Sequence, residues 1–421
     1  MVKLEAMARE ALAQELETLR QSYEAYRAKQ LKLDMSRGKP APDQLDLSMG
    51  LLTETTYRDE TGIDARNYGN LEGMPEARRF FGEMLGAKPE EVFVGGNSSL
   101  NMMYSLIDLG WRLGFEDSPA PWREDEKPKF LCPAPGYDRH FRVTEYFGFE
   151  LITIPMTPTG PDMDKVEALV QDAGVKGIWC VPMYSNPDGY TYSDETVRRL
   201  AGMVTAAPDF KIFWDNAYCV HHLTNTPDHV LNILEETRAA GNEKRALMFC
   251  SLSKVTFPGA GVAAMAACTD NIRYILKNMF PMIISFDKLN QIRHVAFLKD
   301  QQGLAEHMKK HRALVEPKFA AVLRIFAEEL GEDNAHWTKP NGGYFISLYL
   351  PDGCAKRTVQ LCKEAGVVLT GAGAAYPYGV DPADSNIRIA PTFPPLTELE
   401  TASHLLCVCA KMAIAEKLLA D

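Results

Sequence analysis

The sequence predicts a mainly parallel, doubly wound α/β sheet of the seven-stranded type, followed by a smaller α+β unit. From about residue 50 to residue 286, short apolar runs alternate with helical patterns, as they do when each strand is followed by a crossover helix. A long helical tract over 288–329 ends this alternation, and a strand-like run over 343–350 opens further α/β elements. At 421 residues the chain exceeds one simple core, so we expect two domains.

Hydrophobic spacing places the individual elements along the chain. The first 30 residues predict an amphipathic helix, because apolar residues recur at helical spacing: Leu4, Met7, Ala8, Leu12, Leu16 and Leu19. A Pro/Gly-rich connection over 37–42 follows. The expected buried strands are 91–94, 129–132, 150–154, 177–181, 211–214, 246–249 and 262–266. We therefore expect an N-terminal helix and arm over 1–49 that joins the small domain, a large domain over 50–290 and a small C-terminal domain over 291–421.

Composition and charge exclude several classes of function. Hydrophobic residues make up 46% and charged residues 24%, which is ordinary for a globular protein. The net charge of −11 argues against a nucleic acid or an anionic membrane surface as partner. No apolar stretch approaches the roughly 20 residues that span a bilayer, so we expect no membrane association. The first 30 residues also lack a signal-peptide core, which makes export unexpected.

The cysteines predict a reducing compartment and no structural metal. Nine cysteines are scattered through apolar runs without a CxxC pair, as expected for reduced core thiols of a cytoplasmic protein. Cys219, His221 and His222 lie close in sequence, but adjacent histidines on a strand point to opposite faces. His307 and His311 have helical spacing without the glutamate of a zincin motif. We therefore predict no metal site.

One lysine is surrounded by apolar and small residues. Lys254 lies in the run Phe249–Gly261, after Ser251 and Ser253. Burial disfavours the ammonium form and lowers the pKa of a lysine, which favours the neutral amine that forms Schiff bases. The serine hydroxyls suit a phosphate held beside that amine. By itself the tetrapeptide Ser-Leu-Ser-Lys is a weak signal, and a surface lysine is the alternative.

Polar side chains follow two of the predicted strands. Asp215 ends the strand over 211–214, where a carboxylate either caps a turn or holds a proton on a pyridine nitrogen. Tyr218 either packs as an aromatic or donates a hydrogen bond to a phenolic oxygen. Asn186 begins the turn-forming sequence Asn-Pro-Asp-Gly, and its amide is a second candidate donor to such an oxygen.

A glycine-rich loop and two further loops offer groups for a phosphate, a ring and a carboxylate. Gly96, Asn97 and Ser98 join a strand to a helical pattern, which leaves backbone N–H groups for a single phosphate or forms an ordinary N-cap. Tyr137 follows the strand over 129–132 and either stacks on a planar ring or packs in its loop. Arg388 lies within a short apolar strand, where a substrate carboxylate or an internal ion pair would satisfy it.

The order of Asn186, Asp215, Lys254 and Arg388 along the chain resembles fold-type I pyridoxal-phosphate enzymes, in particular class I aminotransferases. The similarity runs from about Ser36 to the C-terminus. The wording of 251–262, Ser-Leu-Ser-Lys-Val-Thr-Phe-Pro-Gly-Ala-Gly-Val, looks like the bacterial aspartate aminotransferase subgroup Ic. The resemblance implies that the large domain binds pyridoxal 5′-phosphate and that two chains form a homodimer with shared active sites.

The resemblance also implies a role for each matching residue. Lys254 matches the Schiff-base lysine that moves the substrate proton, and Asp215 matches the partner of the pyridine nitrogen. Asn186 and Tyr218 match the donors to the ring hydroxyl. Tyr137 matches the aromatic residue against the ring, and Tyr68 matches the tyrosine that reaches the neighbouring subunit's phosphate. The matches around the phosphate are Gly96, Asn97, Ser98, Ser251 and Ser253. The matches at the substrate carboxylate are Gly38, Arg388 and Asn186.

One position departs from the family pattern. The family usually has an arginine about eight residues after the lysine, paired with the phosphate, and this chain has Val262 there. The phosphate is then expected to rely on backbone N–H groups, hydroxyls and a helix dipole.

The resemblance implies ping-pong transamination, with aspartate as amino donor and 2-oxoglutarate as acceptor. Aromatic or 2-aminoadipate donors stay open because of Tyr104, Tyr376 and Tyr378, as does a β-lyase or decarboxylase on the same fold. A cofactor-binding regulator is disfavoured by the acidic charge and the short N-terminal segment. A dicarboxylic substrate needs a second cation, for which the loop candidates are Arg37, Lys39, Arg58, Arg66 and Arg139.

Overall fold

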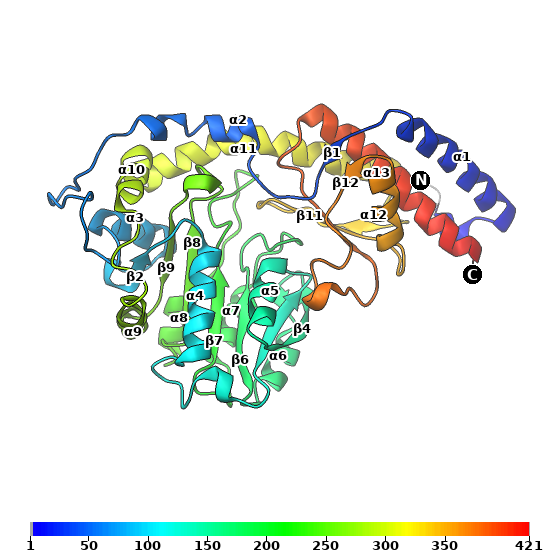
Figure 1. The fold of residues 1–421 in the computed structure, drawn as a ribbon. Coiled ribbons are helices and arrows are strands. Elements are labelled where there is room, and N and C mark those ends of the chain that lie inside the picture. The colour runs from blue at the N-terminus through cyan, green and yellow to red at the C-terminus, as the bar shows by residue number, and fades with distance from the viewer. Residues whose placement is uncertain (1–2, 421) are drawn as a thin grey trace.

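The computed structural model describes residues 3–420 and is built around a mainly parallel central sheet (Figure 1). The strand order is β2-β9-β8-β7-β6-β3-β4-β5. The strands are β2 Val92–Val94, β3 Lys129–Ala134, β4 Glu150–Thr157, β5 Gly160–Pro161, β6 Val175–Cys180, β7 Lys211–Asp215, β8 Ala246–Ser251 and β9 Ala263–Ala266. Only β9 and β5 run antiparallel to their neighbours. The predicted doubly wound fold is confirmed, and β5 is an addition that the alternation does not predict.

Strand residues alternate between two apolar layers because successive side chains point to opposite faces of a sheet. On β7, Ile212 and Trp214 pack into one layer and Phe213 into the other. The first layer is covered by α3 Pro75–Leu85, α6 Met163–Leu169, α7 Asp194–Gly202 and α8 Ile233–Ala239. The second is covered by α4 Ser99–Arg112, α5 Asp138–Tyr146 and α9 Thr269–Met279. Burial of both faces explains why the strands read as continuous apolar runs rather than alternating ones.

A second, smaller α+β unit lies beside the large sheet. It contains the antiparallel sheet β10-β11-β13 and the parallel pair β1-β12. Its strands are β1 Leu33–Asp34, β10 His336–Trp337, β11 Ile346–Tyr349, β12 Val367–Val368 and β13 Asn386–Ile389. The predicted N-terminal helix is α1 Arg9–Arg27, which buries Leu12, Leu16, Leu19 and Tyr23 and packs against α13 Leu396–Ala420. α12 Ala355–Glu364 completes the unit, and both described ends of the chain lie there (Figure 1).

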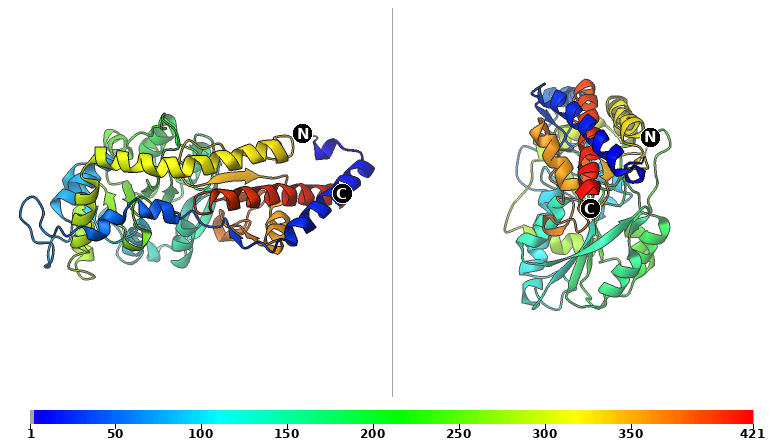
Figure 2. Two further views of the ribbon diagram at one scale, coloured as in Figure 1. Left: turned by 90° about the horizontal axis from the view of Figure 1, so that it is seen from above. Right: turned by 90° about the vertical axis from the view of Figure 1, so that its right-hand side faces the viewer.

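One long helix connects the two cores. The predicted helical tract over 288–329 divides into α10 Lys288–Leu298, α11 Gln301–Ile325 and a π-helical turn over Phe326–Leu330. The break falls at Lys299, which has φ +68°, and Asp300 caps α11 by accepting from Gly303 N at 2.8 Å. Leu304 and Met308 pack in the core of the large sheet, whereas Val315, Phe319 and Val322 pack in the smaller unit. Figure 2 shows α11, in yellow, running over both.

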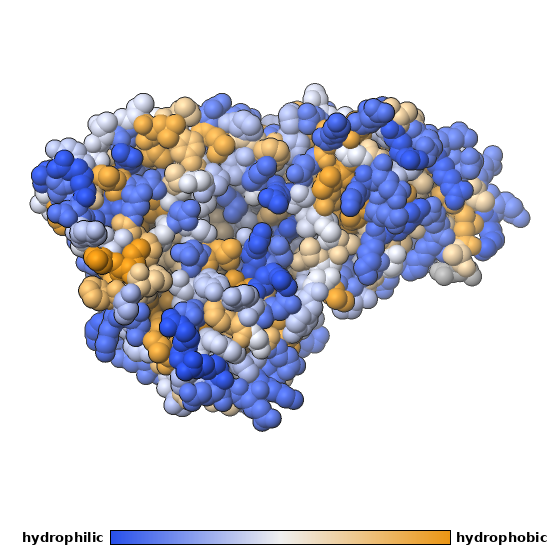
Figure 3. Space-filling view, in the orientation of Figure 1, coloured by the Kyte–Doolittle hydropathy of each residue, from blue (hydrophilic) through white to orange (hydrophobic). Residues whose placement is uncertain are grey.

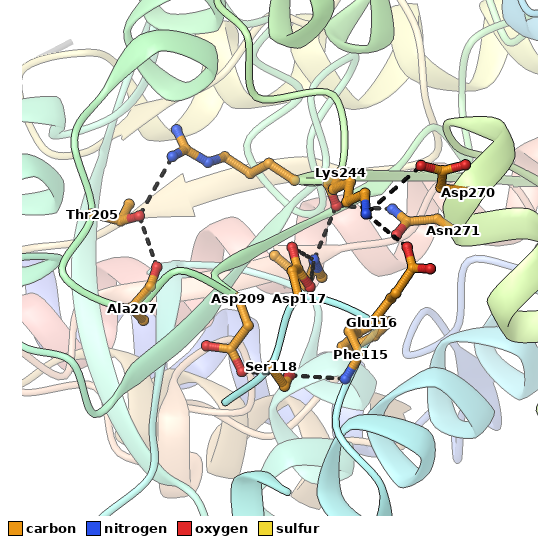
Figure 4. A network of polar contacts seen from close by, with 12 residues as sticks. Phe115, Glu116, Asp117, Ser118, Thr205, Ala207, Asp209, Lys244, Asp270 and Asn271 are labelled. Atoms are coloured by element: carbon orange, nitrogen blue, oxygen red, sulfur yellow. Dashed lines mark hydrogen bonds and ion pairs between the residues drawn. The ribbon is translucent and has the colours of Figure 1, made fainter. Parts of the chain in front are cut away.

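The amino-terminal end of the sheet is held by a buried charged network (Figure 4). Lys211 begins β7 and is fully buried, and its Nζ donates to both carboxylate oxygens of Asp117, at 2.8 and 2.7 Å, and to Lys244 O at 3.0 Å. Asp209 accepts from Trp122 Nε1 at 2.7 Å and from Ser118 Oγ at 2.6 Å. These bonds tie the loop after α4 to the strand starts.

Within residues 3–420, none of the helices combines the length and the apolar character that crossing a bilayer requires.

Candidate active site

A cavity of about 530 Å³ opens at the carboxyl ends of the parallel strands. This is where ligands bind in open α/β sheets, and the volume lies in the range of small-molecule sites. Ten of the sequence-predicted site residues line it: Gly38, Ser98, Tyr137, Asn186, Asp215, Tyr218, Ser251, Ser253, Lys254 and Arg388. They come from segments between 38 and 388, so only the tertiary fold brings them together. Gly96, Asn97 and Tyr68 do not line the cavity.

Lys254 lies in the turn that follows β8. Its Nζ is 5.1 Å from the ring centroid of Tyr218 and 6.0 Å from that of Tyr344. Within residues 3–420 this amine makes no hydrogen bond or ion pair. Burial lowers the pKa of Lys254, and the nearby Asp215 carboxylate offsets part of that shift. The environment therefore favours the neutral, nucleophilic amine.

Asp215 ends β7 with one carboxylate oxygen bound and the other unused. His140 Nε2 lies 2.9 Å from Asp215 Oδ2, and the geometry assigns the Nε2 proton to that bond. The His140 ring stacks on Trp179, with centroids 4.5 Å apart and planes 13° apart. Asp215 Oδ1 is buried and has no partner among the described residues. A buried oxygen without a donor is costly, so this atom is held ready for a ligand N–H.

Two tyrosines bring neutral hydroxyls to the cavity. Burial raises the pKa of Tyr137 to about 12 and that of Tyr218 well above the ordinary tyrosine value. Both phenols therefore stay protonated at neutral pH and act as hydrogen-bond donors. The Tyr137 ring meets the edge of His140, with centroids 4.8 Å apart.

The start of α4 and the turn after β8 line one wall of the cavity with serines. Ser98 and Ser99 stand at the start of this fourteen-residue helix, where free N–H groups and the helix dipole favour an anion. Ser251, the last residue of β8, and Ser253, in the turn that follows, also line the cavity. The predicted Gly96 and Asn97 lie behind this wall: Gly96 O accepts from Ala263 N at 3.2 Å, and Asn97 O accepts from Ser253 Oγ at 3.1 Å. Gly96 has φ +72°, which glycine adopts without strain.

Val262 belongs to the apolar core rather than to the cavity wall. Its side chain is 2% exposed and packs with the large-sheet residues, and its carbonyl accepts from Leu252 N at 2.8 Å. The cationic side chains that line the cavity are Arg37, Arg139, Lys254 and Arg388.

Arg388 lies on β13 and reaches the cavity across the smaller unit. Its Nη1 donates to Asp138 Oδ1 at 2.9 Å and to Asn186 Oδ1 at 3.4 Å. Its guanidinium lies 5.1 Å from the Phe345 ring centroid, and its Nε is buried without a partner among the described residues. Of the two sequence alternatives, the internal ion pair is observed, and the contact with a substrate carboxylate stays a prediction for an arginine that lines the cavity.

Gly38 lies against the same ring as Arg388. A Cβ at this position would overlap the Phe345 ring, so glycine is required for the segment over 36–38 to close on the cavity.

Tyr68 lies on the surface, away from the cavity. Its side chain is 79% exposed, in a loop where Asn67 Oδ1 accepts from Tyr68 N at 2.9 Å. Further exposed apolar side chains lie on the neighbouring segments, at Met49, Leu52, Tyr57, Phe280, Met282 and Ile284. Figure 3 shows apolar surface over the part of the molecule where Figure 1 labels α10, β2 and α9.

The sequence did not predict two of the contacts that organise this site. His140 holds Asp215, and Asp138 holds Arg388. Both follow Tyr137 at the start of α5, and the three-residue spacing of Tyr137 and His140 places them one helical turn apart. That spacing was the available signal for His140. Nothing in the sequence pairs Asp138 with a residue 250 positions away.

Comparison with known proteins identifies one family over nearly the whole chain. The profile of the family described as aspartate amino-transferase matches residues 7–421. The aspartate aminotransferase of Corynebacterium glutamicum is 44% identical over 95% of this chain and 94% of its own length. A Mycolicibacterium smegmatis protein described as an aminotransferase is 49% identical, with both chains fully covered.

Solved structures show the same relationship. The crystal structure of an aspartate transaminase from C. glutamicum superposes with a TM-score of 0.97 at 42% identity, covering 99% of each chain. The α-aminoadipate aminotransferase LysN of Thermus thermophilus shares the fold, with a TM-score of 0.73 at 22% identity and coverage of 92% of this chain and 93% of its own. The chain described here therefore belongs to the aspartate aminotransferase family and is an aminotransferase.

Proposed function

We propose that this aminotransferase binds pyridoxal 5′-phosphate and transfers the amino group of aspartate to 2-oxoglutarate. The observation that carries the proposal is the meeting, in one cavity, of an unpaired, partly buried lysine, a half-free buried carboxylate and an arginine on a separate unit. Lys254, Asp215 and Arg388 supply an amine, an acceptor for a pyridine N–H and a carboxylate receiver. The C. glutamicum relatives named for aspartate support the choice of substrate.

The donor set fits the cofactor. Asp215 Oδ1 lacks a partner and suits a protonated ring nitrogen, while Tyr218 and the Asn186 amide suit the ring hydroxyl. Ser98, Ser251, Ser253 and the start of α4 suit a phosphate, with Gly96 and Asn97 holding the loop behind them. In the LysN structure the bound molecule is N-(5′-phosphopyridoxyl)-L-leucine. When bound, pyridoxal phosphate supplies a carbonyl carbon that condenses with amines and a ring that absorbs the electron pair left by deprotonation.

Each residue of the cavity then has its own role in the reaction. Lys254 Nζ is the general base that takes the proton from the substrate α-carbon, and the lowering of its pKa by burial favours the neutral amine that this task needs. Asp215, oriented by His140, keeps the proton on the pyridine nitrogen. Tyr218 and Asn186 orient the ring, and Tyr137 packs against it. Arg388 and Gly38 fix the substrate α-carboxylate, which aligns the α-proton with Lys254.

Two arginines are the best candidates for the second carboxylate of the substrate. Arg37 and Arg139 line the cavity, and within residues 3–420 neither guanidinium forms an ion pair or hydrogen bond. The other candidates are engaged: Lys39 Nζ lies 3.8 Å from the Phe393 ring centroid, and Arg58 and Arg66 pair with Asp64. A carboxylate entering the cavity therefore meets unpaired positive charge.

Three tyrosines were the reason to consider aromatic amino acids as donors, and none of the three lines the cavity. Tyr104 packs against Tyr146 and Phe147, and the Tyr378 hydroxyl accepts from Leu151 N at 2.8 Å. Tyr376 also lies outside the cavity lining and packs against the apolar layer that α4, α5 and α9 cover. This arrangement favours a dicarboxylic substrate over an aromatic one.

A panel of amino donors with 2-oxoglutarate tests the reaction and the substrate together. We expect aspartate to rank first and to form its 2-oxo acid in equal amount to the glutamate produced. Release of carbon dioxide or ammonia without glutamate would show a decarboxylase or β-lyase. Aromatic donors or 2-aminoadipate ranking above aspartate would overturn the substrate assignment.

Arginine variants locate the second carboxylate. Arg37→Ala and Arg139→Ala should each raise the KM of aspartate about tenfold while changing that of alanine little, because each removes one charge-assisted hydrogen bond. Arg142→Ala is the matched control: this arginine lies on the same helix as Arg139, pairs with Glu145 and does not line the cavity. An equal loss with alanine would contradict the assignment.

We also propose a homodimer in which Tyr68 reaches the neighbouring subunit's phosphate. Its 79% exposure, together with the exposed apolar side chains over 49–57 and 280–284, supports burial against a second copy. Mixing Tyr68→Phe and Lys254→Ala subunits should restore activity above both parents, because one of the two shared sites then has both native residues. Failure of verified mixed dimers to exceed the parents would contradict a shared site.

The domain division and the compartment complete the proposal. The boundary expected at 290/291 falls inside α10, whose Ile292 and Leu298 pack in the large-sheet core. We therefore propose that the small domain begins within α11, between Met308 and Val315, and includes the N-terminal segment. All nine cysteines are free thiols, and all but Cys219 are buried, which supports the cytoplasm as the compartment.

A further inference from the structure

Asp138 occupies an unusual place for a carboxylate, because it faces the residue that is to bind the substrate's carboxylate. Its Oδ1 accepts from Arg388 Nη1 at 2.9 Å, and both side chains line the cavity. The Arg388 side chain is 10% exposed and that of Asp138 is 33% exposed. The pair is therefore shielded enough from solvent for its interaction energy to be significant, and a ligand can still reach it.

The pair does not serve the local structure of α5. Asp138 is the first residue of this helix, but the helix has no side-chain cap, and the Asp138 carboxylate makes no other hydrogen bond or ion pair within residues 3–420. Arg388 is likewise incompletely satisfied, since its Nε is buried and unpartnered. A guanidinium offers five N–H donors in a fork, of which Asp138 and Asn186 use only Nη1.

From this geometry we infer that Asp138 is an internal stand-in for the substrate carboxylate: it holds Arg388 in the unliganded site and is displaced when substrate binds. The inference rests on the proposed function, because it takes Arg388 as the substrate receiver. An incoming carboxylate can form a bidentate contact with the guanidinium, which Asp138 does not form. It must first displace Asp138, because the Asp138 carboxylate already neutralises the charge of Arg388.

Release of Asp138 is inexpensive in this setting. Its position in the first turn of α5 leaves the carboxylate next to the positive end of the helix dipole. The helix dipole can therefore stabilise the freed carboxylate without a new ion pair. Asp138 is thus a positioning residue that sets how strongly a carboxylate must bind before Arg388 accepts it.

Binding of succinate to the cofactor-loaded enzyme tests this inference, because succinate carries two carboxylates but no group that reacts. Calorimetry should show about tenfold tighter binding to Asp138→Asn than to the wild type, since the amide keeps the shape and loses the charge. The KM values of aspartate and 2-oxoglutarate should fall together in this variant, with kcat changing less than KM. Asp138→Glu, which restores the charge, should return the affinity toward that of the wild type.

Two further variants separate this inference from its premises. Asp108→Asn is the matched control: it removes one charge from a carboxylate of similar exposure that pairs with Arg112 and does not line the cavity. It should leave succinate binding unchanged. Arg388→Met should abolish it, and wild-type affinity in that variant would show that the proposed carboxylate site is wrong. Loss of binding in Arg388→Met, combined with unchanged or weaker binding in Asp138→Asn, would overturn only the stand-in role.

Discussion

Each end of the central sheet holds a lysine, Lys211 fully buried and Lys254 partly buried, and the surroundings of the two amines differ. Lys211, at the amino-terminal end, donates to both Asp117 oxygens and to a backbone carbonyl. Lys254, at the carboxyl end, forms no hydrogen bond or ion pair within residues 3–420, and its amine lies 5.1 and 6.0 Å from the ring centroids of Tyr218 and Tyr344. Burial lowers the pKa of both, yet only Lys211 has a direct ion-pair partner that opposes the shift.

The same contrast extends to the neighbouring acidic groups. At the amino-terminal end, both carboxylate oxygens of Asp117 accept hydrogen bonds from Lys211 Nζ. At the carboxyl end, Asp215 uses one oxygen for His140 and keeps the other free, and Arg388 leaves its Nε unpaired. Lys211 and Asp117 satisfy each other at the strand starts, although Asp209 Oδ1 in the same network is also buried without a partner among the described residues. What distinguishes the carboxyl end is that its unpartnered groups, Asp215 Oδ1 and Arg388 Nε, belong to residues that line one cavity.

The largest effect is expected where the unpaired lysine is removed. Lys254→Ala should lower kcat by about 10⁴-fold or more, because both the covalent attachment and the general base are lost. The visible absorbance of the lysine-linked cofactor should disappear while circular dichroism stays native. An unchanged absorption spectrum would overturn the assignment of Lys254.

Removal of the charge of the half-free carboxylate comes next. Asp215→Asn should lower kcat by about 10²–10³-fold, because the amide cannot stabilise a positive charge on the pyridine nitrogen. Steady-state kinetics with aspartate measures the loss. A variant within threefold of the wild type would show that Asp215 acts only through packing with His140.

At the opposite end of the sheet, the expected effect is on stability rather than on activity. Asp117→Ala should lower the free energy of unfolding by about 3 kcal/mol, because the buried Lys211 ammonium loses its counter-charge. Chemical denaturation measures the loss, and kcat per folded molecule should not change. Glu116→Ala is the control: its partly exposed pair with Lys244 should contribute less than about 1 kcal/mol. Equal losses of unfolding free energy in the two variants would show that the buried pair stabilises the protein no more than the surface pair does (Figure 4).

The smallest effect is a pH dependence of the unpaired lysine in the cofactor-free protein. Because the pKa of Lys254 is lower in the folded state, the unfolded chain binds more protons at pH values between the lowered pKa and the ordinary lysine range near about 10.4. The penalty for burying the ammonium is complete below that interval and disappears as pH rises through it. Lys254→Met should therefore be more stable than the wild type at neutral pH, and the difference should shrink toward pH 10. A pH-independent difference in melting temperature would show that burial does not shift this amine.

The sequence alone determined the fold class, since alternating apolar runs and helical patterns report which faces are buried. It also predicted most of the residues that line the cavity, because Ser251, Lys254, Asp215 and Asn186 each end or follow a strand and the carboxyl ends of parallel strands meet at one edge of the sheet. Alternation could not predict β5, which is a two-residue antiparallel addition, or the helix break at Lys299.

Only the tertiary structure decided which charges are paired. Arg388 meets Asp138 across 250 residues, and His140 meets Asp215 across 75, so no local pattern encodes either contact. The same holds for the two lysines, because Lys211 begins one buried strand and Lys254 follows another, each within an apolar sequence. Their difference depends on whether a carboxylate from a distant segment arrives at hydrogen-bonding distance. Lys211 receives Asp117 from the loop after α4, whereas Lys254 faces a cavity.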